Sequence, residues 1–290
     1  METSTATIQP GVRVVRAQRF VEGGGFVVHR PFPVQELSEF DPILLIDEMG
    51  PIVYGPGEAI GAPDHPHRGF ETVTYIIDGA MEHEDSHGHR GTIRSGDVQW
   101  MTAGAGVIHS EMPEREMLER GGRMHGFQIW LNLPKDRKMT QPRYQEYASD
   151  RLPIVTSDGC WVRVIAGEAG GLRSPIDVPT TMLHVRLEPR AQAAFAIPAK
   201  SNAVVYAIDG GATVAGHDLA KRDVALIERW SAQLALAAGS GGFDGLVIAG
   251  APIGEPVARH GPFVMNTRAE LLTAFEDYQA GRFGAIARTT

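Results

Sequence analysis

The sequence contains little of several features that define large classes of protein. It has one cysteine, Cys160, which excludes an internal disulfide framework and indicates a reducing compartment. No apolar run approaches the roughly 20 residues that cross a bilayer. The beginning of the chain has no apolar segment behind a basic start, as a secretory signal would have. We therefore expect a cytoplasmic protein, or a nuclear one in a eukaryote, with no membrane contact.

Positive charge is also scarce. The chain has 27 Lys and Arg against 35 Asp and Glu, a net charge of −8, and no basic run. Binding to nucleic acid needs a basic face that neutralises phosphates. We therefore expect no direct binding to DNA.

What the sequence does contain is a series of short strand patterns. Runs of alternating apolar residues are separated by turn residues, and 34 glycines and 19 prolines supply many tight turns. Three of these runs are Gly11–Arg16, Glu71–Ile77 and Phe127–Leu131. Short strands at this spacing predict an all-β protein built as a sandwich or barrel.

An internal repeat divides the chain into two parts. Val73–Gly79 matches Val204–Gly210 at five of seven positions, at an offset of 131, and Gly96–Val98 resembles Arg222–Val224 at an offset of 126. Two matches in the same order indicate duplicated β-domains. We predict an N-terminal domain over residues 1–134, a Pro/Lys/Arg-rich linker over 135–142 and a C-terminal domain over 143–290.

The C-terminus changes from strand to helix patterns. Thr267-Arg268-Ala269-Glu270 is a capping box, in which the Thr hydroxyl and the Glu carboxylate satisfy free backbone N–H groups. Apolar residues then recur at helical spacing, and Gly281 supplies a stop. The spacing predicts one amphipathic helix over 268–280, packed on a barrel through Leu271, Leu272, Phe275 and Tyr278.

Two segments carry residues that bind metals: His65-Pro66-His67 and His109-Ser110-Glu111. Both place their polar residues at i and i+2, which lie on the same face of a strand. Two such strands side by side would direct three imidazoles and one carboxylate at one point, a set that suits a divalent transition metal. We predict His65, His67, His109 and Glu111 as the metal ligands.

The repeat provides an internal control for this site. A gap-free shift moves His65 and His67 onto Ala196 and Pro198, and it moves His109 and Glu111 onto Ala235 and Ala237. The second copy therefore lacks all four ligands, which indicates that they are not needed for the fold.

Other polar residues have more than one interpretation. Glu71, six residues after His65, shares its strand parity; it could be a ligand or a solvated strand carboxylate, but we favour a base beside the metal. His83, His87 and His89 fit a solvated hairpin better than a second metal site. We expect Cys160 to be buried and unreactive, and Trp100 and Trp130 to lie in the core or in a pocket wall.

Five segments together resemble the pirin family of the cupin superfamily. They are His65–Val73, Gly96–Gly104, His109–Met112, Arg123–Pro134 and Gly261–Thr267. The resemblance implies two cupin barrels, with one metal in the N-terminal barrel and none in the C-terminal one. It implies His65, His67, His109 and Glu111 as ligands and iron as the metal. On affinity grounds zinc or copper would bind such a site at least as tightly as Fe(II), and manganese, nickel or cobalt are also possible.

The resemblance also implies two different functions. Several pirins have quercetin 2,3-dioxygenase activity, in which a flavonol and O₂ react at the metal; Glu111 would then be the catalytic base, with Glu71 in reserve. Other pirins are regulators that bind a protein partner, and the metal would then act as a redox sensor. A third possibility is a bicupin enzyme whose substrate is not a flavonol.

Overall fold

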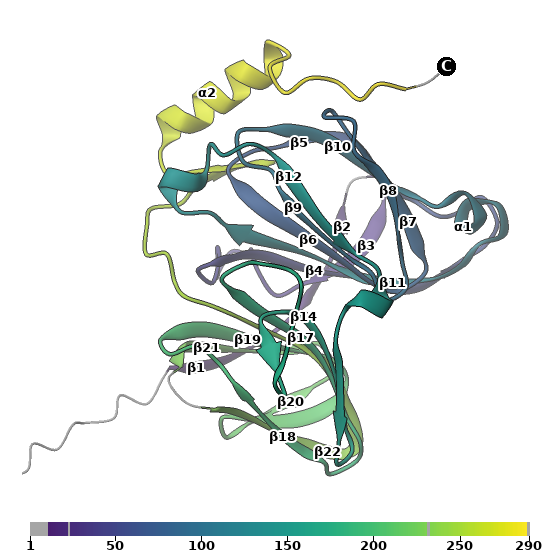
Figure 1. Cartoon of the computed structure of the whole chain (residues 1–290), viewed down its shortest axis with the longest axis vertical. Helices are drawn as coiled ribbons and strands as arrows, with labels where there is room; N and C mark the ends of the chain where they lie inside the picture. Colours follow the sequence, from purple (N-terminus) through teal and green to yellow (C-terminus); the bar gives the residue numbers. More distant parts are fainter. Residues whose placement is uncertain (1–10, 23, 231–232, 289–290) are drawn as a thin grey trace, which may run out of the picture. The chain divides into compact units, whose positions relative to one another are not determined.

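The computed structural model describes residues 11–22, 24–230 and 233–288. The described residues form two compact units, one comprising those within 17–152 and 253–288, the other those within 11–16 and 153–252. We call the first the histidine unit, because it contains His65, His67 and His109, and the other the second unit. Figure 1 shows that both are built mainly of strands. No helix in the described part of the chain is long and apolar enough to cross a membrane.

The histidine unit contains two main sheets. The larger has the order β12 (Arg143–Tyr147), β9 (Val98–Thr102), β6 (Phe70–Asp78), β11 (Gly122–Asn132), β4 (Ile43–Tyr54), β3 (Phe26–Arg30), β2 (Gln18–Glu22). The smaller has the order β5 (Ala62–His67), β10 (Val107–Pro113), β7 (Ala80–Asp85), β8 (Arg90–Arg94). The remaining elements are the strand pair β23 (Ala258–His260) and β24 (Phe263–Met265), helices α1 (Arg115–Arg120) and α2 (Arg268–Gln279), and 3-10 turns η1 (Lys135–Arg137) and η2 (Ser149–Arg151).

The second unit is built on one large sheet around an apolar core. Its main order is β1 (Val12–Arg16), β21 (Asp223–Trp230), β19 (Ser201–Val214), β22 (Gln233–Gly250), β17 (Thr180–Leu187), β14 (Cys160–Ala166), β13 (Ile154–Ser157). Strand β18 (Gln192–Ala196) also pairs with β22, β20 (His217–Ala220) pairs with β19, and β15 (Glu168–Ala169) pairs with β16 (Leu172–Arg173). The long β19 and β22 contain register shifts, at which such strands bend.

The prediction of an all-β protein with a short C-terminal helix is confirmed.

The internal repeat is visible in the strand register. Tyr75 of β6 pairs with Val98 of β9, and Tyr206 of β19 pairs with Val224 of β21. The turns match as well: the amide of Gly96 donates to the carbonyl of Ile76 at 2.7 Å, and the amide of Arg222 donates to that of Ala207 at 2.7 Å. The two units therefore contain the same pair of strands in the same register, with the same hydrogen bond before the second strand of the pair.

The residues of the second unit that the gap-free shift aligned with the metal ligands do not face the interior of that unit. Strands β18 and β22 pair with Phe195 opposite Leu234, and these two side chains are buried in the core. Ala196 and Ala235 are exposed. A shift of one residue between strands exchanges the two faces, because side chains alternate. The residues that do face this interior are apolar, so the interior here still offers no metal-binding side chain.

The division of the chain differs from the predicted boundaries. Strand β12 pairs with β9, with Arg143 opposite Thr102, so residues after 142 continue the histidine unit. The predicted linker 135–142 is also packed there: Lys138 is buried and its ammonium donates to the carbonyl of Gly69 at 2.7 Å and to Oδ1 of Asn132 at 2.6 Å. The buried charge of Lys138 is held by these oxygen acceptors.

The C-terminal helix forms as predicted but packs on the histidine unit. In the capping box, the amide of Glu270 donates to Oγ1 of Thr267 at 3.2 Å and the amide of Thr267 donates to Oε2 of Glu270 at 2.8 Å. Leu271 is buried in a cluster with Phe263 of β24, whereas Leu272 is 56% exposed. The predicted apolar face was therefore wrong at Leu272.

Candidate metal centre

Three histidines meet where β5 and β10 pair. His65 lies directly opposite His109 in this antiparallel register, and His67 follows two residues later on the same face. The ring centroid of His65 lies 4.3 Å from that of His109 and 4.7 Å from that of His67. The ring centroids of His67 and His109 lie 4.9 Å apart. One nitrogen from each ring lies within 4.8 Å of the other two. The predicted convergence of these three side chains is confirmed.

Backbone carbonyls orient two of the rings. His65 Nδ1 lies 2.8 Å from the carbonyl oxygen of Pro63, and His67 Nδ1 lies 3.4 Å from that of Pro262. A carbonyl only accepts, so each Nδ1 carries a proton, and in the neutral form of such a ring Nε2 has the free lone pair. This is the tautomer in which histidine binds a metal through Nε2.

His109 provides the test of whether a metal fits. Its side chain is fully buried, and neither ring nitrogen has a hydrogen-bond partner among the described residues. Burial, together with the neighbouring His65 and His67, lowers the pKa of His109 well below its usual range, so the ring is neutral. A buried polar atom without a partner is costly, and a neutral imidazole is the form that binds metals. The three histidines therefore fit a divalent transition metal.

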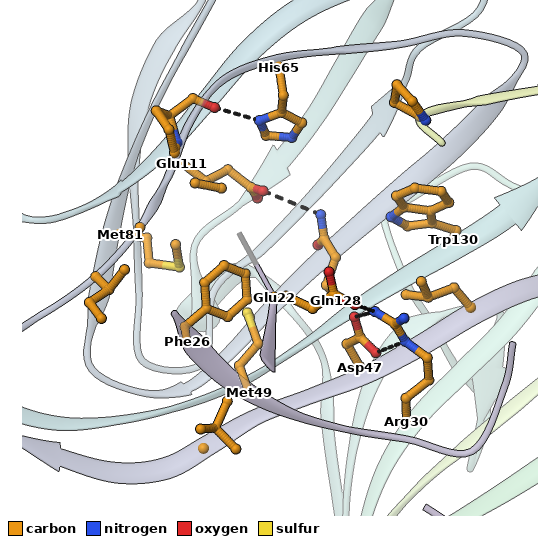
Figure 2. A pocket seen from close by; sticks show the side chains of 18 of the residues that line it. Glu22, Phe26, Arg30, Asp47, Met49, His65, Met81, Glu111, Gln128 and Trp130 are labelled. Carbon is orange, nitrogen blue, oxygen red and sulfur yellow. Dashed lines mark hydrogen bonds and ion pairs between the residues drawn. The ribbon is translucent and has the colours of Figure 1, made fainter. Parts of the chain in front are cut away.

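Glu111 lies beside this group but is not part of it. Its carboxylate accepts a hydrogen bond from Thr74 Oγ1 at 2.8 Å and from Gln128 Nε2 at 3.4 Å. The register of β10 against β5 shifts between His109 and Glu111, which places Glu111 opposite Ala62. Figure 2 shows Glu111 pointing into the same cavity as His65, with Gln128 beside it. Its role as fourth ligand therefore stays a prediction.

Two of the three histidines, His65 and His67, open onto a cavity of about 560 Å³ inside the histidine unit. His65, His67 and Glu111 line one part of it, and Trp130 forms a wall. Much of the remaining wall is apolar, from Phe26, Leu45, Met49, Ile52, Met81 and Met124. Its volume is within the range of small-molecule sites, which are mostly apolar with a few polar groups.

Comparison with known proteins agrees with this geometry. The Pirin family model matches residues 25–131, and that of the Pirin C-terminal cupin domain matches residues 182–284. Pirin-like protein 2 of Arabidopsis thaliana is 40% identical over 289 residues, which cover 95% of this chain and 86% of that protein. The chain belongs to the pirin family. Human pirin is 39% identical over 278 residues, covering 91% of this chain and 90% of that one.

A solved structure extends the comparison to the whole bicupin fold. The crystal structure of quercetin 2,3-dioxygenase from Acinetobacter baumannii superposes with a TM-score of 0.89 at 34% identity, covering 96% of this chain and 100% of that one. The two units of this pirin are therefore its two cupin domains.

Glu71 does not lie where strand parity placed it. Strand β5 ends at His67, the chain turns at Gly69 with φ +89°, and β6 begins in the other sheet. The parity count from His65 was therefore wrong, because it assumed one continuous strand. The Glu71 carboxylate accepts from Trp100 Nε1 at 3.0 Å and from Thr102 Oγ1 at 2.7 Å, and it is not among the residues that line the cavity.

The histidine-rich hairpin is only partly in solvent. His87 and His89 are exposed, but His83 is buried, with Nε2 2.7 Å from Glu146 Oε1 and its ring stacked on Tyr144. The interpretation as a solvated hairpin was wrong for His83, because alternation along β7 turns this residue inward. The described residues contain no second group of three metal-binding side chains.

The remaining predictions concern Cys160 and the tryptophans. Cys160 is half-buried, and burial raises the pKa of its thiol, which disfavours the reactive thiolate. Trp100 lies in the core and Trp130 in the cavity wall.

Sequence reasoning missed Arg259, which reaches the cavity from β23, almost 200 residues after His65. No local motif marks this arginine.

Proposed function

We propose that this pirin is a metal-dependent dioxygenase of the quercetin 2,3-dioxygenase type, which opens the ring of a flavonol with O₂. The observation that carries the proposal is the convergence of three histidines, two of which line a cavity large enough for a planar aromatic substrate. The similarity to the quercetin 2,3-dioxygenase from Acinetobacter baumannii supports the same reaction. His65, His67 and His109 would hold the metal, with Glu111 as the fourth ligand.

The metal we propose is iron, with zinc, manganese, nickel, cobalt or copper as alternatives that the donor set also accepts. When bound, it supplies a Lewis acid that stabilises the deprotonated flavonol and open positions for substrate and O₂.

Glu111 has the position of a general base. A flavonol must lose the proton of its 3-hydroxyl before O₂ adds, and a carboxylate at the histidine end of the cavity is within reach of that proton. Thr74 and Gln128 hold the Glu111 carboxylate at the cavity wall. The hydrogen bonds of Glu71 to Trp100 and Thr102 instead make it part of the core, so we assign the base to Glu111 alone.

The apolar wall of the cavity keeps water away from the reacting ring. Met49, Met81, Met124 and Phe26 surround the space in front of the histidines, and flexible methionine side chains adapt to planar aromatic ligands. Trp130 packs edge-on against His67, with ring centroids 5.2 Å apart, and limits how that imidazole rotates.

An oxygen-uptake assay tests the proposal. Protein loaded separately with iron, manganese, nickel, cobalt or copper is mixed with quercetin, and O₂ consumption and carbon monoxide release are recorded. We expect equal amounts of O₂ consumed, quercetin lost and carbon monoxide formed with at least one metal. Absence of turnover with every metal would refute the flavonol as substrate.

The regulatory function has less support in the structure. A sensor that acts through its surface would hold the metal closed beneath that surface, whereas here His65 and His67 line a cavity of about 560 Å³. Binding of a protein partner that depends on the oxidation state of bound iron, with no flavonol turnover, would favour the regulator.

A further inference from the structure

Arg259 lies in the wall of the cavity, separated from the histidines by one aromatic ring. Its guanidinium carbon is 4.7 Å from the centroid of the Trp130 ring, and this ring contacts His67. Both Arg259 and His67 line the cavity. A ligand that contacts the metal site therefore has a cationic group within the same space.

The other charged groups of this wall are already paired. Arg30 forms a two-point ion pair with Asp47, with both N–O distances 2.6 Å, and a further contact with Glu22 at 2.7 Å. Figure 2 shows Arg30 and Asp47 joined on the side of the cavity opposite His65. Three carboxylates act electrostatically on Arg259, and two of them, Asp47 and Glu22, are bound to Arg30, whereas the third, Glu39, forms no ion pair with Arg259.

Arg259 itself has no such partner. Among the described residues no carboxylate lies within 4.0 Å of it, and its hydrogen bond is from Nη1 to the carbonyl of Leu44 at 3.2 Å. A guanidinium has five N–H donors, so most of them are available. Burial and the nearby charge of Arg30 lower the pKa of Arg259, and the more distant carboxylates of Asp47, Glu39 and Glu22 offset this only in part.

We propose that Arg259 determines substrate specificity by binding an anionic oxygen at the end of the substrate remote from the metal. The substrate class is then a planar aromatic with two adjacent metal-binding oxygens at one end and a carboxylate or acidic phenol at the other. The metal-binding end rests on the proposed function, and the Arg259 end rests on the unpaired guanidinium. A charge-assisted hydrogen bond from arginine to such an oxygen is stronger than a neutral one.

A pair of probes that differ by one carboxylate tests this role without turnover. Catechol and 3,4-dihydroxybenzoate share the two adjacent oxygens, and only the second carries a remote anion. Their affinities are measured by calorimetry on zinc-loaded full-length protein. We expect 3,4-dihydroxybenzoate to bind about ten- to a hundredfold more tightly than catechol to the unchanged protein.

Two variants at Arg259 assign the preference to this side chain. In Arg259→Met the preference should fall to about threefold or less, because the long apolar side chain keeps the packing on Trp130 but removes the donors. In Arg259→Lys it should be intermediate, because lysine keeps the charge without the planar pair of donors. Unchanged catechol affinity and zinc content show that each variant is folded.

Arg186 provides a matched control in the second unit. It also stacks on a tryptophan, with its guanidinium carbon 4.8 Å from the Trp161 ring, but it does not line this cavity. Arg186→Met should leave the preference unchanged.

The outcomes separate this inference from the proposed function. Equal affinity of the two probes for the unchanged protein, or a preference that persists in Arg259→Met, would overturn the role of Arg259. A preference that depends on Arg259, in protein that does not oxidise quercetin with any metal, would support this role and refute the flavonol.

Discussion

The two units of this pirin share a strand scaffold but differ in what they place inside it. The pairs Tyr75–Val98 and Tyr206–Val224 occupy the same register. On the strands where one unit has His65 opposite His109, the other pairs Phe195 with Leu234. The scaffold tolerates either a polar or an apolar interior, so the histidines are not needed to make the fold.

Both units retain a glycine at a position where the backbone of the neighbouring strand leaves no room for a side chain. Gly126 lies opposite Ile76, and Gly245 lies opposite Ala207. A Cβ at Gly126 would lie 2.8 Å from the carbonyl oxygen of Tyr75, and one at Gly245 would lie 2.5 Å from that of Tyr206. Shared positions of this kind serve the fold, and positions that differ between the units are where function is to be sought.

The largest expected effect is loss of the metal when a histidine of the histidine unit is replaced, but not when a histidine of the second unit is replaced. His109→Ala removes a ligand, so we expect metal content to fall to less than about a tenth of an ion per chain after dialysis, and quercetin turnover to be lost. Atomic spectroscopy measures the metal. His184→Ala is the control, because His184 is a buried histidine of the second unit that hydrogen-bonds Asp244 at 2.6 Å. Metal lost equally from both variants would contradict a site confined to the histidine unit.

The next effect separates metal binding from catalysis. Glu111→Gln keeps the size of the side chain but removes the base, so we expect kcat for quercetin to fall by about 10²- to 10⁴-fold. The metal remains bound through the three histidines. Stopped-flow O₂ consumption and metal content are measured together. A variant that keeps its metal and its full kcat would exclude Glu111 as the base.

The metal site could be predicted from sequence because its geometry is local. His65 and His67 share a face through simple strand alternation. The register shift between His109 and Glu111 leaves Glu111 outside the group of three histidines. Long-range geometry could not be predicted: the turn at Gly69 sends Glu71 into another sheet, and Lys138 is buried by segments distant in the sequence. The alternation that works within one strand fails across a turn, and composition alone does not show which charges find buried partners.

A matched pair of glycine substitutions tests the shared scaffold. Gly126→Ala and Gly245→Ala each force a Cβ against a backbone carbonyl, so each should lower the free energy of unfolding by about 2–3 kcal/mol. Urea denaturation of each unit, followed by hydrogen exchange to locate the change, is the measurement. If only one of the two destabilises its unit, the structural equivalence of these positions is wrong.

A smaller effect distinguishes the carboxylate of Glu71 from that of Glu111. Glu71→Gln leaves either Trp100 Nε1 or Thr102 Oγ1 without an acceptor, so the free energy of unfolding should fall by about 1–2 kcal/mol. Quercetin turnover at a temperature where the variant is folded should stay within about threefold of normal. A fall in kcat like that of Glu111→Gln, with unchanged stability, would return Glu71 to a catalytic role.

The smallest expected effect is a pH dependence carried by Lys138. Burial lowers the pKa of this ammonium to about 8, partly opposed by Glu255 and Glu270, whereas the unfolded chain keeps the ordinary 10.5. Between these two values the unfolded state binds more protons, so this group makes stability rise with pH through that window and has no effect on the slope well below it. Three oxygen acceptors favour the charged form and reduce the effect, so we expect about 1 kcal/mol between pH 8 and 10. Urea denaturation of the unchanged protein and of Lys138→Met across this range measures it as a difference in slope. Parallel curves would show that the buried ammonium keeps its ordinary pKa, and that its three acceptors replace the water it has lost.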